Sequence, residues 1–484
     1  MTKFYITTTI PYVNAAPHIG HAQEFAEADT VARYRRSKGD KVYLLSGTDE
    51  NAIKNVEAAE KAGIPVKDFV AQNSGVFEKL LRVLNVSYGQ FIRTTEERHK
   101  VGAQALWRAT KKEDIYKKTY RGLYCIGCEL FYTREELTED GECHEHPGRK
   151  LEVVEEENYF FKLSNYTEWL HELIESDSLR IIPHTRKNEI LAFIGRGLED
   201  FSISRPIERS KGWGVPVPGD PKQTIYVWYD ALANYITALG YPDTKAELYK
   251  EFWFDNSDRV HILGKGVSRF HAIYWPAMLK SAGIPLPTLE FIHGYCTVDG
   301  QKMSKTIGNV TNPIDIISEY GADVLRYYLL REISAYGDGD FSIPKLRERY
   351  NADLANGLGN LASRISTIAS RFSPILRVEL DGDVEKKIKE TKQTIEEKMK
   401  EFRFHEALSA LWDLIAFADV YMNDKKPWEA GGRQNEIGNL ATILYCVGEE
   451  LRPFLPETAE KILKNVSLSP VVNVSKIETL FPRL

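Results

Sequence analysis

Residues 4–21 read Phe-Tyr-Ile-Thr-Thr-Thr-Ile-Pro-Tyr-Val-Asn-Ala-Ala-Pro-His-Ile-Gly-His, and they set out the start of the fold. The apolar run over residues 4–10 predicts a strand, and the stretch Ala22–Arg36 after it predicts a helix. A strand that turns into a helix directs free backbone N–H groups and the positive end of the helix dipole at one point. His18 and His21 share one face of that first turn, so the sequence predicts an anion site with imidazole donors.

The same alternation of strand and helix continues downstream and is broken once. Val42–Ser46 predicts a strand and Ile53–Ala62 a helix. After an interruption the pattern resumes with predicted strands at Thr224–Trp228, Arg259–Leu263 and Phe291–Val298, and with a helix that starts at Tyr229. This order is typical of a doubly wound, Rossmann-like parallel sheet, in which ligands bind beyond the carboxyl ends of the strands.

The interruption carries a cluster of metal-binding residue types. Cys125 and Cys128 form one C-x-x-C knuckle, and Cys143 and His146 form a second knuckle of the same spacing. Two such knuckles predict a tetrahedral zinc site with three thiolates and one imidazole. His144 is a competing ligand, although the spacing favours His146. Because four protein ligands leave no open position, we expect one structural zinc ion.

A second basic cluster lies far along the chain. Residues 300–309 read Gly-Gln-Lys-Met-Ser-Lys-Thr-Ile-Gly-Asn, which places Lys302 and Lys305 in a loop after a predicted strand. Lysine ammonium groups stabilise the charge that develops when a phosphoryl group is displaced. Taken alone the segment is equally typical of a solvated loop, but together with the histidine pair it indicates two basic clusters that grip one polyphosphate.

The remainder of the chain is predicted to be helical. Ala322–Arg331 has the pattern of a short amphipathic helix, and residues 374–383 read as a loop between helices. Beyond residue 346 apolar residues recur at helical spacing, which indicates an α-helical bundle. The positions are Val384, Ile388, Ile395, Met399, Phe402, Leu408, Leu411, Ile415, Ile437, Leu440, Leu444, Val447 and Leu451.

Bulk composition narrows the class of protein. The chain has 484 residues, 63 Lys+Arg against 69 Asp+Glu, and a formal net charge of −6, so its overall charge does not indicate a nucleic-acid partner. Nucleic acids bind local basic patches, and Arg33–Arg36 is a candidate that is equally typical of a solvated helix face. No run approaches the roughly 20 apolar residues of a membrane helix, and no signal-peptide pattern is present. We therefore expect a cytoplasmic protein without a membrane partner.

The two basic motifs resemble those of a known family. His18-Ile19-Gly20-His21 with Lys302-Met303-Ser304-Lys305-Thr306 resembles the two ATP signatures of class I aminoacyl-tRNA synthetases, and the surrounding sequence is similar to methionyl-tRNA synthetases over essentially the whole chain. The resemblance implies a methionine–tRNA ligase that uses ATP with Mg²⁺, and L-methionine and tRNA(Met), including the initiator, as substrates. We expect a monomer.

The resemblance also implies a division into domains. A catalytic Rossmann domain would occupy residues 1–116 and 206–298, interrupted by a zinc-bearing insertion at 117–205. The lysine loop and a region that contacts the tRNA stem would follow at 299–345, and a helical anticodon-binding domain at 346–484.

Site residues are carried over by motif position. His18, His21, Lys302 and Lys305 would act in catalysis and bind ATP together with Tyr12, Gly20 and Gly264. The methionine pocket would consist of Ile10, Tyr12, Asp49 for the ammonium group, Trp228, Ala231, Leu232, Tyr235, Val267 and His271, with Trp275 beside them. Asn360, Arg364 and Trp428 would read the anticodon, because amides and guanidinium groups bond base edges and an indole stacks on an unpaired base. A single aromatic residue of this set is more often part of a core.

Departures from the family pattern occur near the nucleotide and amino-acid sites. Asn51 and Ala52 stand where many members have His and Gly, and Gly266 stands where an aspartate is common. That aspartate would bond the ribose of ATP, so we expect ribose recognition to differ or to be weaker here. Thr306 replaces a serine and keeps the hydroxyl group.

Other functions remain open at this point. A class I synthetase for another amino acid would share the ATP motifs, although the branched-chain enzymes carry a larger insertion and the cysteine enzyme binds a catalytic zinc with dispersed ligands. A tRNA-binding relative that has lost catalysis or altered its amino-acid specificity is the other alternative, with Gly266 as its mark.

Overall fold

The computed structural model describes residues 2–132, 134–144, 151–298, 301–302, 311–376, 378–429, 434–469 and 471–484. The chain forms two compact units. The first, called the sheet unit, contains Met1–Pro17, Gly39–Leu80 and Tyr88–His293. The second, called the helical unit, contains His18–Lys38, Leu81–Ser87 and Gly294–Leu484.

The sheet unit is built on a six-stranded sheet with the order β3-β2-β1-β12-β13-β7. Every neighbouring pair in this sheet is parallel, which confirms the doubly wound architecture. The predicted strands near residues 4, 42 and 259 are present, and the first ends earlier than expected, at Thr7. The strands are β1 (Lys3–Thr7), β2 (Lys41–Thr48), β3 (Gln90–Arg93), β7 (Arg180–Ile182), β12 (Arg259–Gly264) and β13 (Leu289–His293).

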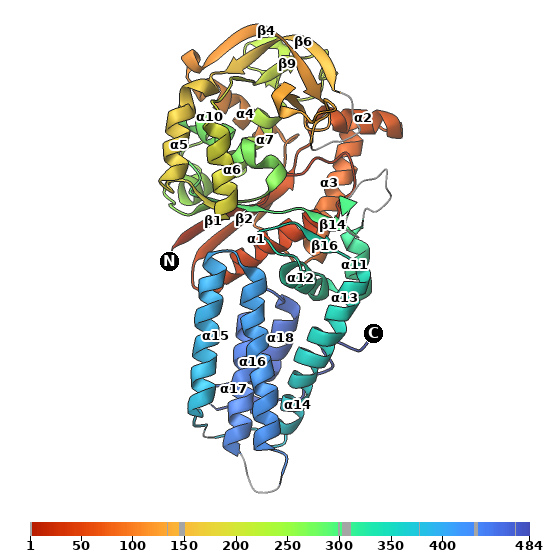
Figure 1. Ribbon diagram of the computed structural model, residues 1–484, viewed down its shortest axis with the longest axis vertical. Helices are drawn as coiled ribbons and strands as arrows, with labels where there is room; N and C mark the ends of the chain where they lie inside the picture. Colours follow the sequence, from red (N-terminus) through yellow and green to blue (C-terminus); the bar gives the residue numbers. More distant parts are fainter. Residues whose placement is uncertain are drawn as a thin grey trace. The chain divides into compact units, whose positions relative to one another are not determined.

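Helices of the sheet unit pack against this sheet (Figure 1). The side chains between them form an aromatic-rich core. Tyr5, Tyr235, Trp253 and Trp275 are fully or almost fully buried in it. The α-helices are α2 (Ile53–Ala62), α3 (Val66–Val83, whose last residues belong to the helical unit), α4 (Glu97–Ala109), α5 (Thr167–Glu175), α6 (His184–Ile194), α7 (Val227–Leu232), α8 (Asn234–Thr237), α9 (Glu247–Tyr249) and α10 (Trp275–Ala282). Shorter helical turns cover Lys112–Asp114, Arg134–Glu136, Leu163–Tyr166, Lys250–Phe254, Lys265–Val267 and Phe270–Tyr274.

Two predicted strands have different limits in the structure. The strand expected at Thr224–Trp228 is β11 (Asp220–Ile225), which belongs to a small antiparallel sheet and not to the parallel sheet, and Val227 already lies in helix α7. A short apolar run does not distinguish a buried strand from a buried helix, which explains the error. The strand expected at Phe291–Val298 is divided into β13 and β14 (Cys296–Val298). Gly294 separates them, and a Cβ there would lie 2.0 Å from the carbonyl oxygen of Gly337, so the backbone contact requires glycine.

Two small antiparallel sheets lie within or next to the predicted insertion, and the second extends beyond it, because β10 and β11 lie at Pro216–Val217 and Asp220–Ile225. The first has the order β5-β4-β6-β8 and the second β10-β11-β9. One part of the range 117–205 does not belong to them, because β7 pairs with β13 in the main sheet. The exact division of the chain into five domains stays a prediction. The remaining strands are β4 (Ile115–Cys125), β5 (Leu130–Tyr132), β6 (Glu152–Phe161), β8 (Phe201–Ser202), β9 (Ser204–Pro206) and β10 (Pro216–Val217).

The helical unit begins with the connection between β1 and β2, which is helix α1 (Ile19–Ser37). A small sheet of order β15-β14-β16 follows, with β15 at Gln301–Lys302 and β16 at Gly339–Phe341. The other helices are α11 (Pro313–Tyr320), α12 (Ala322–Arg331), α13 (Ile343–Arg349), a π-helix (Tyr350–Gly359), α14 (Asn360–Ala369), α15 (Gly382–Lys400), α16 (Phe404–Lys425), α17 (Gln434–Leu451) and α18 (Pro456–Asn465). A hairpin of β17 (Val466–Ser467) and β18 (Asn473–Val474) comes after α18.

The predicted helical bundle is confirmed. Helices α14 to α17 lie side by side in Figure 1 and contact one another. All thirteen apolar positions that the sequence assigned to its core are buried. The loop predicted at 374–383 ends slightly earlier, because α15 begins at Gly382. Helical spacing therefore predicted the burial correctly, since each apolar stripe faces the neighbouring helices.

Candidate active site

The histidine pair lies at the N-terminus of α1 and closes that helix end. His18 is the N-cap residue, and its Nδ1 accepts the backbone N–H of Gly20 at 3.1 Å. In return, the Nδ1 of His21 accepts the backbone N–H of His18 at 3.1 Å. The two rings lie 3.8 Å apart between centroids. The arrangement is a capping box in which imidazole rings replace the usual hydroxyl and carboxylate groups.

These contacts fix the proton positions. Since each Nδ1 accepts a hydrogen bond from the backbone, the remaining proton of each neutral ring is on Nε2. Burial lowers the pKa of His18 to about 4. Burial, followed by the repulsion from His18, lowers the pKa of His21 well below its usual value. Both rings are therefore neutral hydrogen-bond donors at neutral pH in the free protein, and their role toward a phosphate stays a prediction.

The lysine motif lies mostly outside the described residues. The backbone of Lys302 is in β15, while Lys305 falls in the range 303–310, which the structure does not describe. Gly264 ends β12, and Gly266 lies in the helical turn Lys265–Val267 that follows. The roles of these residues stay predictions.

The candidate ammonium site is a buried carboxyl group at the end of β2. Asp49 is 2% exposed, and its Oδ1 accepts the backbone N–H of Asn51 at 3.1 Å. Burial, and after it the charge of Asp230, raise the pKa of Asp49 well above its usual value. A cationic ligand beside Asp49 would offset both effects and favour the ionised form.

The departure at Asn51 has a structural consequence. The Nδ2 of Asn51 donates to Asp230 at 2.6 Å, and the Nε2 of His99 lies 2.8 Å from the other oxygen of the same carboxyl group. His99 also contacts the Thr237 hydroxyl at 2.8 Å through Nδ1. Sequence reasoning did not assign Asp230 or His99. Asp230 could have been proposed from the sequence, because it lies inside the Trp228–Tyr235 stretch that supplies the predicted pocket residues.

The remaining pocket candidates form two groups within the sheet unit. Tyr12 and Trp228 meet edge to face at 5.9 Å, and Trp228 stacks on Phe270 at 3.6 Å. Deeper, the Tyr235 hydroxyl lies 2.7 Å from His271 Nε2, while His271 Nδ1 bonds the carbonyl of Val267 at 2.9 Å. A carbonyl only accepts, so His271 is protonated on Nδ1 and Tyr235 donates to its Nε2.

Sequence reasoning did not assign Phe270 to the pocket, although Phe270 directly precedes His271. Trp275, Ala231 and Leu232 are buried, and Ile10 is partly exposed.

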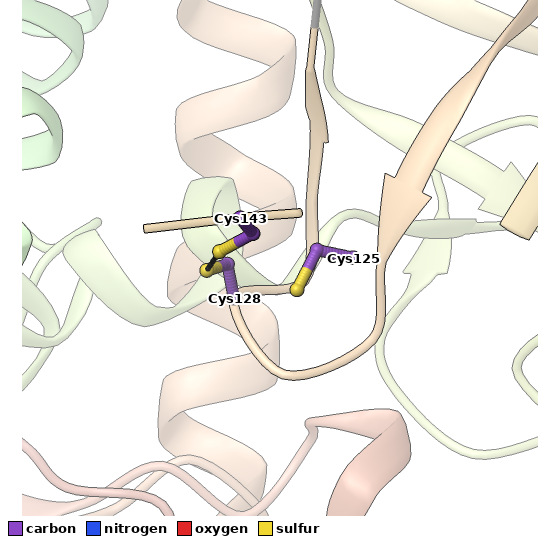
Figure 2. A group of neighbouring side chains, drawn as sticks. All are labelled: Cys125, Cys128 and Cys143. Carbon is purple, nitrogen blue, oxygen red and sulfur yellow. Dashed lines mark hydrogen bonds between the residues drawn. The ribbon is translucent and has the colours of Figure 1, made fainter. Parts of the chain in front are cut away.

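The predicted metal site is partly described. Sγ atoms of Cys125, Cys128 and Cys143 lie within 4.8 Å of one another (Figure 2). Tetrahedral Zn–S bonds of about 2.3 Å require sulfurs roughly 3.8 Å apart, so the three thiols fit a zinc ion. Figure 2 shows Cys125 at the end of β4 and Cys128 in the turn after it. His146 lies outside the described residues, so the fourth ligand stays a prediction.

The cysteine turn touches the aromatic pocket directly. Trp228 Nε1 donates to the carbonyl oxygen of Cys128 at 3.2 Å. Lys54 Nζ donates to the carbonyl oxygen of Gly127 at 3.0 Å and lies 3.5 Å from the ring centroid of Tyr12. The turn of the predicted zinc site therefore contacts two predicted pocket residues, Trp228 directly and Tyr12 through Lys54.

The anticodon candidates lie on the helical unit. Asn360 is exposed at the start of α14, and Arg364 on the same helix bonds Asp419 of α16 at 2.9 Å. Trp428 follows α16 and is 50% exposed. The alternative that Trp428 is a core residue is thus excluded, and an indole exposed to this extent can stack on a base.

Fold and site together define the class of protein. The parallel sheet, the histidine-capped first crossover helix and the C-terminal helical bundle are those of a class I aminoacyl-tRNA synthetase. The family described as "tRNA synthetases class I (M)" matches residues 4–366, and "Anticodon-binding domain of tRNA ligase" matches residues 381–480. Across the described residues, no helix is long and apolar enough to span a membrane.

Individual relatives identify the branch of this class. The methionine–tRNA ligase of Brucella suis is 43% identical over 95% of this chain and 91% of its own length. That of Thermotoga maritima is 41% identical over 96% of this chain and 75% of its own length. Mycobacterium tuberculosis methionyl-tRNA synthetase bound by methionyl-adenylate has a TM-score of 0.92, 35% identity, and coverage of 99% of this chain and 100% of its own. The chain belongs to the methionyl-tRNA synthetases.

Proposed function

We propose that the chain joins L-methionine to tRNA(Met), including the initiator, in two steps. In the first step, a carboxylate oxygen of methionine forms a bond to the α-phosphorus of ATP, and pyrophosphate leaves as the bond to the β-phosphate breaks. In the second step, a hydroxyl of the 3′-terminal adenosine attacks the acyl carbon, and AMP leaves. Because the nucleophile of the first step is already ionised, catalysis consists of positioning and charge stabilisation.

The observation that carries this proposal is the pair of imidazole rings at the N-terminus of α1. Their Nδ1 atoms are occupied by the backbone, which leaves Nε2–H as the donor of each ring. His18 and His21 would donate to ATP phosphates, Gly20 would let the nucleotide approach the backbone, and Tyr12 and Gly264 would line its site. Lys302 and Lys305 would stabilise the leaving pyrophosphate. ATP would enter as its Mg²⁺ complex.

Methionine would bind in the pocket of the sheet unit. Asp49 would bind its ammonium group, and Trp228, Tyr235 and His271 would form walls around its side chain. Contacts between sulfur and aromatic rings contribute about 0.3–1.5 kcal/mol, and burial of the methylene groups contributes the rest. The remaining pocket residues would be Ile10, Tyr12, Ala231, Leu232 and Val267.

A zinc ion would hold the cysteine turn in place. Cys125, Cys128 and Cys143 would bind it with His146 as the fourth ligand, and four protein ligands leave no position for a substrate. Its contribution would be structural, through the turn that contacts Trp228. We further propose a cytoplasmic monomer.

Two substitutions test whether Lys305 acts in methionine activation and Trp428 in tRNA recognition. Lys305→Ala should lower methionine-dependent ATP–pyrophosphate exchange about 100-fold or more, because a group that stabilises transition-state charge is lost, and should leave tRNA affinity unchanged. Trp428→Ala should leave exchange unchanged and lower kcat/KM for tRNA charging roughly 5- to 150-fold, the equivalent of about 1–3 kcal/mol of stacking. Wild-type exchange in Lys305→Ala, or exchange that falls as much as tRNA charging in Trp428→Ala, would contradict the assignment.

The alternative of a tRNA-binding relative with lost or altered specificity has no support in the comparisons. The relatives named above are methionine–tRNA ligases along nearly the whole chain. The exchange assay with other amino acids also tests this alternative, since exchange should depend on methionine.

A further inference from the structure

A fully buried arginine connects the histidine helix to the C-terminal helices. Arg326, on α12, is 0% exposed, and its Nη1 lies 2.8 Å from Oδ2 of Asp29 on α1, which is also 0% exposed. Burial of a guanidinium group is costly unless every donor finds a partner. The position of Arg326 therefore requires an explanation beyond packing.

Further donors of Arg326 reach a turn of the C-terminal helices. Nε donates to the carbonyl oxygen of Phe454 at 2.8 Å, and Nη2 donates to that of Pro453 at 3.0 Å. This turn connects α17 to α18. One guanidinium group thus joins α12, α1 and the α17–α18 turn, which only a planar fork of several donors can do.

Asp29 is held from several sides at once. Arg33 Nε donates to its Oδ2 at 2.7 Å, and the backbone N–H of Ser87 donates to its Oδ1 at 2.7 Å. Although burial raises the pKa of Asp29, the charges of Arg326 and Arg33 outweigh it and keep this pKa below its usual value. Asp29 is therefore an ionised anchor, and Arg33, a candidate RNA contact in the sequence, is used inside the protein instead.

The anchor lies on the same helix as the histidine pair. Asp29 follows His21 by eight residues of continuous α-helix, a separation of roughly 12 Å at the standard rise. A helix of this length moves as a rigid rod, so a contact that fixes Asp29 also fixes the axial position and the rotation of the helix end that carries His18 and His21.

We propose that Arg326 is a positioning residue for the histidine pair: it sets α1 on α12 and on the α17–α18 turn, and thereby aims the Nε2–H donors at the phosphates of ATP. The inference rests on the proposed role of His18 and His21. It adds that the placement of these rings depends on the C-terminal helices, whose bundle carries the anticodon candidates.

Asp323 provides a matched control on the same helix. It is 5% exposed, and its Oδ2 accepts the backbone N–H of Thr458 in α18 at 2.7 Å. Asp323 thus contacts α18, whereas Arg326 contacts the carbonyl groups of the preceding turn and Asp29 of α1, and the charges of Asp323 and Arg326 also attract each other. A substitution there should reduce stability without moving the histidine pair.

The experiment compares Arg326→Lys with Asp323→Asn in ATP–pyrophosphate exchange, with rates normalised to titrated active sites. Arg326→Lys should raise KM for ATP or lower kcat about tenfold and leave KM for methionine unchanged, because lysine keeps the charge and loses the fork. Asp323→Asn should lower the Tm and leave both KM values unchanged. If Arg326→Lys does not fold, Asp29→Asn serves in its place, since it keeps the hydrogen bonds of Ser87 and loses the charge.

A double variant distinguishes positioning from general destabilisation. His18→Asn removes one of the two donors through which Arg326 is expected to act, so Arg326→Lys should slow the His18→Asn enzyme by a smaller factor than it slows the wild type. Multiplied losses in the double variant, or an Arg326→Lys enzyme that behaves like Asp323→Asn, would overturn the inference while the histidine assignment stands. If His18→Asn alone leaves ATP kinetics unchanged, the proposed histidine role fails, and this inference fails with it.

Discussion

His18 combines two functions that substitution can separate. Its Nδ1 caps α1, while its Nε2–H is the proposed phosphate donor. Asparagine at an N-cap accepts the same backbone bond, whereas alanine does not, and loss of a cap costs about 1 kcal/mol. His18→Asn should therefore keep the Tm near that of the wild type and lower ATP–pyrophosphate exchange about 100-fold.

His18→Ala should add the loss of the cap, with a lower Tm and a similar loss of exchange. Thermal melts and exchange rates of both variants check this prediction. An asparagine variant with full activity would show that the ring serves only as a cap.

The lowered pKa of His18 has a consequence for stability. The pKa is about 4 in the native protein and near 6.5 in an unfolded chain. Between these values the unfolded chain binds a proton that the native protein does not, so the free energy of unfolding should decrease as the pH falls from about 6.5 to about 4. Urea unfolding at several pH values measures this slope, and His18→Asn should make it shallower. An unchanged slope in the variant would contradict the assignment.

At this scale the sequence predicted residue types better than their interactions. The spacing of the two histidines and of the cysteines predicted that each set would lie close together, because spacing determines which side chains share a turn. The tautomers, the bond from Asn51 to Asp230 and the contact of Phe270 with Trp228 depend on segments far apart in the chain, so no local pattern could reveal them.

Among the elements, the cysteine turn links the proposed zinc site to the proposed methionine pocket. Since Trp228 donates to the carbonyl oxygen of Cys128, loss of the metal should release this ring. We expect one zinc per chain, a shift of tryptophan fluorescence on chelation, and a several-fold rise of KM for methionine, because one hydrogen bond contributes about 1 kcal/mol.

Variants at two buried cysteines provide the comparison. Cys143→Ser should lower the zinc content and reproduce the fluorescence shift, while Cys446→Ser, on α17 and outside the cluster, should retain zinc and the wild-type spectrum. Metal analysis together with fluorescence reports both effects. A zinc-free protein with the wild-type spectrum would refute the link between the turn and the pocket.

The ends of the helices and strands show how far the spacing of apolar residues predicts secondary structure. The bundle positions were predicted correctly because a repeating stripe over several turns is a strong signal. The errors at residues 224–228 and 291–298 arose in short apolar runs, where a helix start or a glycine at a close backbone contact ends the strand.

In the whole molecule, the histidine helix belongs to the same compact unit as the C-terminal helices. The sequence predicts a catalytic domain that begins at residues 1–116 and includes α1, and this division stays a prediction. The buried contacts of Asp29 and Arg326 tie α1 to residues some 300 positions later. Such long-range pairs leave no trace in local patterns.

The central claim is that the histidine pair and the lysine motif bind one triphosphate. A crystal structure with methionine and a non-hydrolysable ATP analogue tests it most directly. The account predicts Nε2 of His18 and of His21, and Nζ of Lys305, at about 3 Å from phosphate oxygens, with the methionine ammonium group on Asp49. A bound triphosphate that contacts neither the histidines nor Lys305 would contradict it.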